Sequence, residues 1–445
     1  MFQRPQIPFS VSAGLAALSF AFAAPASAQS LLQLYRDALA NDPTYAAARA
    51  QYQANQEAVP QARAGLLPTV GLSATYERSN NDYDWAPPTP SSSFDVNTRT
   101  YALSLSQPLF RWQNWETYKQ SQLSVVAAEA QFVQAQQDLI LRVSQAYLDV
   151  LAAQDSLDFT RAQKVAIEQQ LASAKRNFEV GTATITDTNE AQARYDLAVA
   201  QEISAENDLQ VKRAALQQIT GKAPGELVPL RTGVQLPAPQ PSAIDQWVTS
   251  AEQDNIGVRV AQANAEIASR EISKARAGHH PTVDLVASYA RSYNPTTASL
   301  DRMTSTQAGI QVSVPLFAGF AVQSRVTQTV ALEDQAKQNL EAAKRTAAQG
   351  ARAAYLGVTN GLAQVKALEA AERSSQTALE ANQLGYKVGV RVNIDVLNSQ
   401  QQLYQTRRDL SKARYDTLLG ALKLKSAAGR LAEADIEQVD TLFSK

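Results

Sequence analysis

The chain has 445 residues, with 41 Lys+Arg against 42 Asp+Glu, two His and no Cys. The charges nearly cancel, so the composition favours neither a nucleic-acid-binding protein nor a disordered acidic tail. Without Cys there is no disulfide, thiol nucleophile, Cys-ligated metal or lipid-modified cysteine. The 77 Ala and 46 Gln, both good helix formers, indicate long helices that pack closely through small side chains.

Residues 1–28 are expected to be a signal peptide. A basic residue precedes an apolar stretch at 11–24, and small residues at 26–28 match the positions that a signal peptidase recognises. The apolar stretch is shorter than the roughly 20 residues of a membrane-spanning helix. No later apolar run reaches that length, so a membrane part of the mature chain would have to be a β-barrel.

Residues 29–220 are expected to form a first structural repeat that begins with a helix and continues with a strand hairpin at 67–108. Asp42 can cap a helix whose first residue is Pro43. Within the hairpin, apolar residues alternate with small polar ones, as from Val70 to Tyr76. This pattern suits strands about ten residues long that cross an outer membrane, with lipid on one face and water on the other.

Residues 109–223 contain no proline, which permits a very long helix. Apolar residues recur every seven positions from Val126 to Tyr147, a spacing typical of coiled coils. As one helix, 114–180 would extend about 100 Å at 1.5 Å per residue. Gly181 is expected to end this helix in a left-handed conformation, after which the chain reverses into a return helix.

The second half repeats the first. The motif at 64–70 recurs 213 residues later at 277–283, and the motif at 106–110 recurs 207 residues later at 313–317. The second repeat is expected to contain a hairpin at 281–315, a long helix, a tip turn at Gly389 and a return helix. We expect the linker at 221–245, the second repeat at 246–430 and the C-terminal segment at 431–445. The four prolines expected at helix–strand junctions are Pro68, Pro108, Pro281 and Pro315.

Four strands cannot close a barrel, and an open sheet edge in lipid would leave backbone groups unpaired. A membrane location therefore requires several chains that each contribute four strands. Aromatic residues near the strand ends are expected to form a girdle at the membrane interface. They are Phe110, Trp112, Trp115, Phe317 and Phe320.

This order of elements resembles the TolC-type outer-membrane channel family of drug efflux and one-step protein secretion. The motifs that carry the resemblance stand at 178–187 and 386–397, together with Asn41-Asp42-Pro43. The resemblance implies a mainly α protein with a β membrane part, assembled as a homotrimer. Its twelve-stranded β-barrel, four strands from each chain, would continue into a long α-helical coiled-coil tunnel. Without Cys, the chain falls in the non-lipidated branch.

The resemblance also implies a location and partners. The channel would lie in the outer membrane of a Gram-negative bacterium, with its helical part in the periplasm. It would dock on a periplasmic adaptor and an inner-membrane ABC or proton-driven exporter. The linker and the C-terminal segment would wrap the tunnel as an equatorial belt. We expect no enzyme activity, cofactor, metal site or nucleic-acid partner, because no motif for these is present.

Residues near the two tip glycines are candidates for a gate. By resemblance, Asp395 belongs to an acidic ring at the periplasmic entrance, while Asn398 stands where the family has a second aspartate. Tyr386 and Arg391 match positions that bond to the neighbouring coil near Thr186 and Asp187. A ring of three carboxylates at a constriction would set ion selectivity. The simpler alternative is that Asp187 and Asp395 cap helices.

A second class of protein stays open at this point. A soluble periplasmic coiled-coil adaptor or scaffold would carry the hairpins as β-ribbons. The repeated apolar strand face and its aromatic girdles favour the outer-membrane channel, because an adaptor does not require them. The sequence does not distinguish drugs from secreted protein as the cargo.

Overall fold

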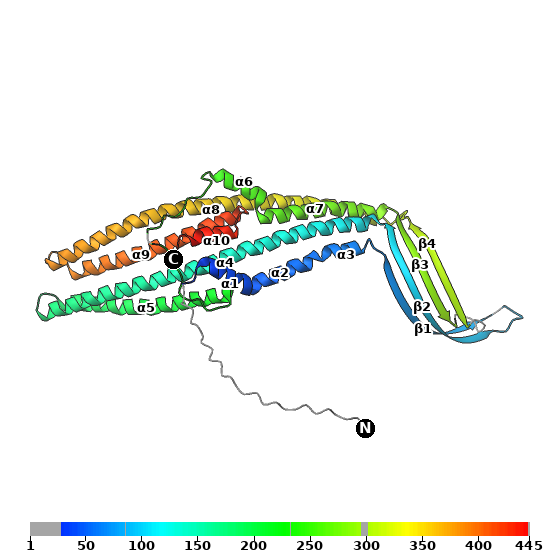
Figure 1. The fold of residues 1–445 in the computed structure, drawn as a ribbon, viewed down its shortest axis with the longest axis horizontal. Coiled ribbons are helices and arrows are strands. Elements are labelled where there is room, and N and C mark those ends of the chain that lie inside the picture. The colour runs from blue at the N-terminus through cyan, green and yellow to red at the C-terminus, as the bar shows by residue number, and fades with distance from the viewer. Residues whose placement is uncertain (1–27, 85, 232, 295–300, 444–445) are drawn as a thin grey trace, which may run out of the picture.

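The computed structural model describes residues 28–445, apart from 85, 232, 295–300, 444 and 445. The expected signal peptide therefore lies outside the described residues except for its last position. Figure 1 shows an elongated molecule in which long helices run along most of the length and a sheet continues from one end. Among the described residues, no helix has both the length and the apolar character that a membrane-spanning helix requires.

The sheet has four antiparallel strands in chain order. They are β1 (Thr69–Tyr83), β2 (Ser92–Phe110), β3 (Thr282–Tyr293) and β4 (Arg302–Ser313). The pairing of β2 with β3 joins the two hairpins into one sheet, although these strands lie far apart in the sequence. Within the described residues, β1 and β4 are the sheet edges and each pairs with one strand only.

The expected alternation is present on the strands. The apolar side chains of β1 and β4 point away from the rest of the chain: Leu72 is 79% exposed and Ile310 is 66% exposed. The alternating positions Gly71 and Ser73 are small or polar. One face of the sheet is thus apolar but has no protein core to cover it.

The first hairpin is longer than expected. Its strands have 15 and 19 residues instead of about ten, and they extend through positions that are rich in Ser, Asn and Asp. Polar pairs across the two strands support this extension, such as Arg78 with Asp95 at 3.5 Å and Ser93 with Asn80 at 3.1 Å. Because such pairs need no apolar face, alternation of hydrophobicity did not reveal them.

Three of the four prolines lie at the expected helix–strand boundaries, and Pro108 does not. Pro68 directly precedes β1, Pro281 directly precedes β3, and Pro315 follows β4 by two residues. Pro108 instead lies inside β2, which runs on to Phe110, so its assignment to a junction was wrong. The register between β2 and β3 shifts between Pro108 and Phe110. A bulge of this kind tolerates a residue that has no N–H to donate.

Two long helices extend along most of the molecule. They are α4 (Trp112–Glu179) and α8 (Ala321–Lys387), with 68 and 67 residues. At 1.5 Å per residue each is about 100 Å long. The return helices α5 (Ile185–Thr220) and α9 (Asn393–Ala427) run back beside them, and both turns lie at the end opposite the sheet (Figure 1).

Shorter helices cover the part of α4 and α8 near the sheet. The first set is α1 (Leu31–Asn41), α2 (Pro43–Gln56) and α3 (Ala58–Ala64); the second is α6 (Ile244–Asp254), α7 (Ile256–Arg276) and the single turn η1 (Ala277–His279). The last helix is α10 (Glu433–Asp440). Asp42 caps α2 as expected: its carboxylate accepts the Tyr45 N–H at 2.6 Å and two hydrogen bonds from Arg142 at 2.9 and 3.0 Å.

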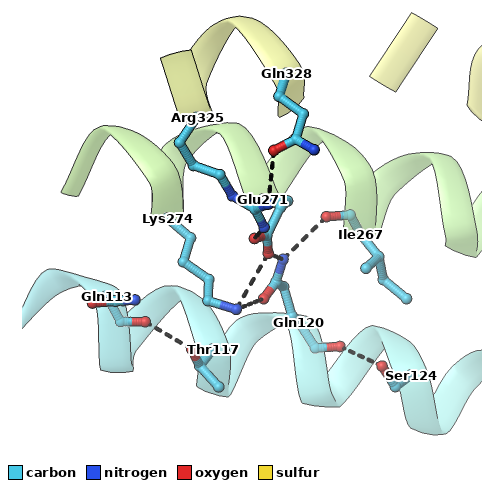
Figure 2. A network of polar contacts seen from close by, with 9 residues as sticks. All are labelled: Gln113, Thr117, Gln120, Ser124, Ile267, Glu271, Lys274, Arg325 and Gln328. Atoms are coloured by element: carbon cyan, nitrogen blue, oxygen red, sulfur yellow. Dashed lines mark hydrogen bonds and ion pairs between the residues drawn. The ribbon is translucent and has the colours of Figure 1, made fainter. Parts of the chain in front are cut away.

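A polar cluster joins three helices just below the sheet (Figure 2). Glu271 of α7 accepts hydrogen bonds from Gln120 of α4 at 2.8 Å and from Arg325 of α8 at 3.0 Å. Lys274 adds an ion pair at 3.2 Å. Burial raises the pKa of the Glu271 carboxyl, but these hydrogen bonds and charges together hold it below its ordinary value. Glu271 thereby fixes the position of α7 between α4 and α8.

The largest apolar core lies midway along the helices. Tyr147 of α4 is fully buried there, and its hydroxyl donates to the Val228 carbonyl at 2.8 Å. The Phe443 ring packs edge-on against Tyr147 at 5.3 Å, and Arg231 bonds to the Leu442 carbonyl at 3.3 Å. The linker and the C-terminal segment therefore lie side by side on this core.

Candidate gate at the helical tip

The two tip turns have the same backbone geometry. Gly181 and Gly389 have φ of 77° and 79°, the left-handed conformation that ends a helix at little cost only for glycine. In the first turn, the N–H groups of residues 182 and 183 bond to the Asn177 carbonyl at 2.8 and 3.1 Å. In the second, those of residues 390 and 391 bond to the Gly385 carbonyl at 2.9 and 3.1 Å.

A second glycine shapes the second tip. A Cβ atom at Gly385 would lie 2.7 Å from Cγ of Arg391 and 3.3 Å from its Cβ. The turn therefore folds Arg391 back over the end of α8, and a larger residue at 385 would displace it.

Sequence analysis gave capping of the return helix as the alternative role of Asp187. In the structure, Asp187 takes part in the cap but is not the N-cap residue. Helix α5 begins at Ile185 and Thr184 is its N-cap, so Asp187 is the third helical residue. The Asp187 carboxylate accepts the Thr184 N–H at 3.0 Å, and the Thr184 hydroxyl accepts the Asp187 N–H at 3.2 Å. This reciprocal pair is a capping box. Thr186 lies exposed in the same turn.

Asp395 lies in the first turn of α9, where the helix dipole stabilises a negative charge. Arg391 approaches its carboxylate at 3.6 Å, and both side chains are partly exposed. Within the single chain, Arg391 therefore pairs with Asp395 rather than with Thr186 or Asp187. A weak surface pair of this kind leaves both groups able to form other contacts.

Near the tip, three sets of contacts among the described residues join the second coil pair (α8 and α9) to the first (α4 and α5). The Tyr386 hydroxyl accepts a hydrogen bond from Asn177 at 3.1 Å. Asn393 donates to the Asp187 carbonyl at 3.3 Å and accepts from Gln170. Because Asn393 is almost fully buried, these bonds satisfy polar atoms that water does not reach.

Arg194 of α5 makes the third set. Its guanidinium donates to the Gln401 side chain at 2.7 Å and to the Asn398 side chain at 3.2 Å, both on α9. Asn398 is neutral, so it bonds to Arg194 without cancelling the positive charge. An aspartate at this position would form an ion pair with Arg194 instead.

The expected site residues thus divide into two groups. Tyr386, Arg391, Asp395, Asn398, Thr186, Asp187 and the two tip glycines lie together at the helical tip, whereas the four prolines lie at the opposite end beside the sheet. Sequence reasoning missed Arg194, Asn393 and Asn177. One signal was available for Asn393: its counterpart in the first repeat, 208 residues earlier, is Ile185, so a polar residue replaces an apolar one.

No group of three or more His, Asp or Glu side chains in the described part of the chain is placed to hold a metal ion. The adjacent residues His279 and His280 lie at the sheet end. The His280 ring packs near Trp112, with centroids 6.4 Å apart. Packing at the helix–strand boundary therefore accounts for His280.

Solved structures share this fold. The outer membrane channel CmeC of Campylobacter jejuni matches with a TM-score of 0.78 at 16% identity, over 100% of this chain and 98% of that one. The outer membrane protein VceC of Vibrio cholerae matches with a TM-score of 0.77 at 19% identity, over 90% of this chain and 96% of that one. The elongated helices and the sheet therefore follow an architecture known from outer-membrane channels.

Sequence relatives cover almost the whole chain. The outer membrane protein TolC of Vibrio cholerae is 34% identical over 98% of this chain and 97% of that protein. The alkaline protease secretion protein AprF of Pseudomonas aeruginosa is 32% identical over 94% of this chain and 88% of that protein. The sequence model of the family described as "Outer membrane efflux protein" matches residues 34–222 and 247–430, one segment in each repeat. The chain therefore belongs to the outer membrane efflux protein family, whose members are passive channels of the Gram-negative outer membrane in efflux or type I secretion and not enzymes.

Proposed function

We propose that three copies of this chain form one exit channel, which receives its cargo from a periplasmic adaptor and an inner-membrane ABC or proton-driven exporter. The observation that carries the proposal is the four-stranded sheet, in which β1 and β4 each pair with one strand only among the described residues and one face is apolar and exposed. Three such sheets provide twelve strands, enough to close a barrel whose outer face meets lipid. The helices of each chain then continue from the barrel as the wall of a tunnel.

The helical tip is the gate of this channel. In each subunit, Asn177, Arg194 and Asn393 hold the second coil pair against the first through hydrogen bonds with Tyr386, Asn398, Gln401, Asp187 and Gln170. Opening moves the coil pairs apart and breaks these bonds. Two of these bonds, Asn177 to Tyr386 and Asn393 to Asp187, lie within two turns of a tip glycine, and a rotation of the coils about the tips breaks them first.

Charge at the entrance comes mainly from Asp395. Three copies around an axis form one acidic ring, which attracts cations and repels anionic solutes. Arg391 lies 3.6 Å from the same carboxylate and moderates this charge. Asn398 adds a polar ring and no negative charge. We therefore expect a weakly cation-attracting entrance that passes either small molecules or an unfolded polypeptide.

Cell fractionation and bilayer recording test the proposed function. The mature protein is expected in the outer-membrane fraction, as an oligomer on unboiled denaturing gels that dissociates on heating. Purified and reconstituted, it is expected to conduct ions in a planar bilayer. A soluble periplasmic adaptor, the other candidate from the sequence, would be extracted by carbonate as a monomer and would pass no current. That result would refute the channel.

A further inference from the structure

The exposed face of the sheet changes in character along the strands. Residues directly opposite each other on antiparallel strands share a face, so the registers divide this face into rows that cross the four strands. In the row nearest the helices, Val283 lies opposite Val312. In a central row, Leu103 lies between Leu72 and Tyr289. These rows form an apolar band of the kind that meets lipid.

Farther from the helices, two successive rows combine tyrosine with arginine. We call them the arginine rows, and their aromatic and basic residues are Tyr101 and Arg291, then Tyr76, Arg99, Tyr293 and Arg302. In the outer of the two rows, Arg99 lies between Tyr76 and Tyr293, and Arg302 completes the row on β4. None of the side chains in these two rows is acidic.

The length of the strands places the arginine rows at the far edge of the membrane. Val283 and Tyr293 lie ten residues apart on β3, which is about 33 Å at 3.3 Å per residue. With strands tilted by about 40°, this corresponds to about 25 Å across the bilayer, the height of the apolar band of an outer-membrane barrel. The helices continue from the opposite end of the strands (Figure 1) and lie in the periplasm. The arginine rows therefore lie at the headgroups of the outer leaflet.

The arginines of these rows have no carboxylate partner. Among the described residues, Arg99, Arg291 and Arg302 form no ion pair, whereas Arg78, one row farther out, approaches Asp95 at 3.5 Å. The positive charge of the arginine rows is therefore not cancelled within the described chain, although the neighbouring row shows that the face can hold an ion pair.

Neutral contacts orient two of the three arginines. The Arg99 guanidinium lies over the Tyr76 ring, 6.0 Å from the ring centre. Arg291 donates a hydrogen bond to the Tyr289 hydroxyl at 3.1 Å. Neither contact removes a positive charge, so both guanidinium groups stay available to an anion.

Three guanidinium groups therefore face one patch of the headgroup layer. Arg99 and Arg302 lie two strands apart, with their Cα atoms about 10 Å from each other, and Arg291 lies on the strand between them. Asp301 precedes Arg302 just outside β4 and, within the described residues, forms no ion pair with it. A positive charge beside lipid requires a counter-charge, and the planar guanidinium bonds phosphate oxygens through two N–H groups at once.

We propose that Arg99, Arg291 and Arg302 bind the phosphate groups of a glycolipid in the outer leaflet of the outer membrane. That leaflet consists mainly of lipopolysaccharide, whose lipid A part carries phosphates at the depth of the arginine rows. The tyrosines of the same rows place their rings at the edge of the acyl chains and their hydroxyls among the headgroups. The inference depends on the outer-membrane location of the family and not on the number of subunits or on the gate.

Native mass spectrometry of the detergent-purified protein tests the site without any substitution. The natural protein is incubated with lipid A, or with lipid A from which the phosphates have been removed. We expect the phosphorylated form to bind about tenfold more tightly, because the other form lacks the charge-assisted hydrogen bonds. Equal binding of the two forms would overturn the proposal. Complete displacement of lipid A by an equal concentration of inorganic phosphate would also overturn it, because the site would then take free phosphate and not lipid.

Two matched variants assign the site to residues. Arg99→Gln with Arg302→Gln is expected to weaken lipid A binding about tenfold and to remove the preference for the phosphorylated form. Arg78→Gln is the control, because it removes a charge from the same face but one that Asp95 already pairs. Its binding is expected to stay within about twofold of the natural protein. An equal loss in both variants would show an unspecific effect of charge and overturn the assignment.

Replacement by lysine separates the guanidinium geometry from the charge. Arg302→Lys keeps the positive charge but cannot form two parallel bonds to one phosphate, so its binding is expected to fall between those of the natural protein and Arg302→Gln. Unchanged binding would contradict the guanidinium–phosphate contact. Unboiled gels report whether each variant assembles. If the double variant did not, Arg99→Gln and Arg302→Gln would be measured singly, each with a loss of about threefold expected and no loss refuting the site.

Discussion

Replacement of Arg194 is expected to shift the channel toward its open state. In each subunit Arg194 donates two hydrogen bonds from α5 to α9, to Gln401 and Asn398. At an exposed position each is worth about 0.5 kcal/mol. Arg194→Ala then costs the closed state about 1 kcal/mol per subunit, or about 3 kcal/mol when three subunits open together. This corresponds to roughly a hundredfold change in the equilibrium between closed and open channels.

Single-channel recording in planar bilayers measures this shift directly. Lys175→Ala is the matched control, because Lys175 bonds to Gln192 at 3.2 Å within the first coil pair and, in the part of the chain that the structure describes, has no hydrogen bond or ion pair to the second. Both variants remove one positive charge near the tip. Arg194→Ala is expected to raise the fraction of time spent in high-conductance states, and Lys175→Ala is not. Equal behaviour of the two variants would refute the assignment of Arg194 to the gate.

Three further changes have defined outcomes. Asp42→Ala removes the cap of α2 and leaves Arg142 unpaired, and it is expected to destabilise the fold by about 2 kcal/mol in thermal unfolding followed by circular dichroism; an unchanged melting temperature would contradict the cap. Because the folded-state pKa of Glu271 is lowered, its stabilising contribution is present above the unfolded pKa of about 4.3 and is lost as pH falls through the lower folded value. Glu271→Gln should therefore flatten the dependence of melting temperature on pH below about 5, and an equally steep profile would contradict this. Asn398→Asp adds one carboxylate per subunit, which pairs with Arg194 and neutralises its positive charge, and is expected to strengthen block by a multivalent cation on the periplasmic side several-fold; unchanged block would place residue 398 away from the pore axis.

The sequence predicted the architecture well because its signals are local or repeated. Absence of proline over 109–223 permitted the long helix, and the structure contains it as α4. The duplicated motifs predicted two equivalent hairpins, and the registers of β1–β2 and β3–β4 agree with the motif spacings. Signals of this kind depend on one stretch of chain at a time, so no tertiary information was needed.

Errors at element ends have a common cause. The polar extension of the first hairpin carries no hydrophobic alternation, and cross-strand pairs such as Arg78 with Asp95 support it instead. Pro108 lies in a strand because a bulge absorbs its missing N–H. The N-cap of α5 is Thr184 and not Asp187, although a carboxylate is the stronger hydrogen-bond acceptor. The left-handed turn at Gly181 determines where the helix can begin, and this places Asp187 one turn inside it.

The contacts of the gate were the least predictable part. Arg194 and Asn398 are 204 residues apart, and Asn177 and Tyr386 are 209 apart. Nothing local marks one Arg or Asn among many on a polar helix as the partner of a residue in the other repeat. Only the packing of the second coil pair, α8 and α9, against the first brings these side chains together.

The mass of the assembly tests the central claim most directly. Native mass spectrometry of the mature protein, purified from outer membranes in detergent, reports how many chains share one particle. The account predicts three, so that three open sheets complete one barrel. A particle containing a single chain would leave both sheet edges unpaired in lipid and would contradict the account.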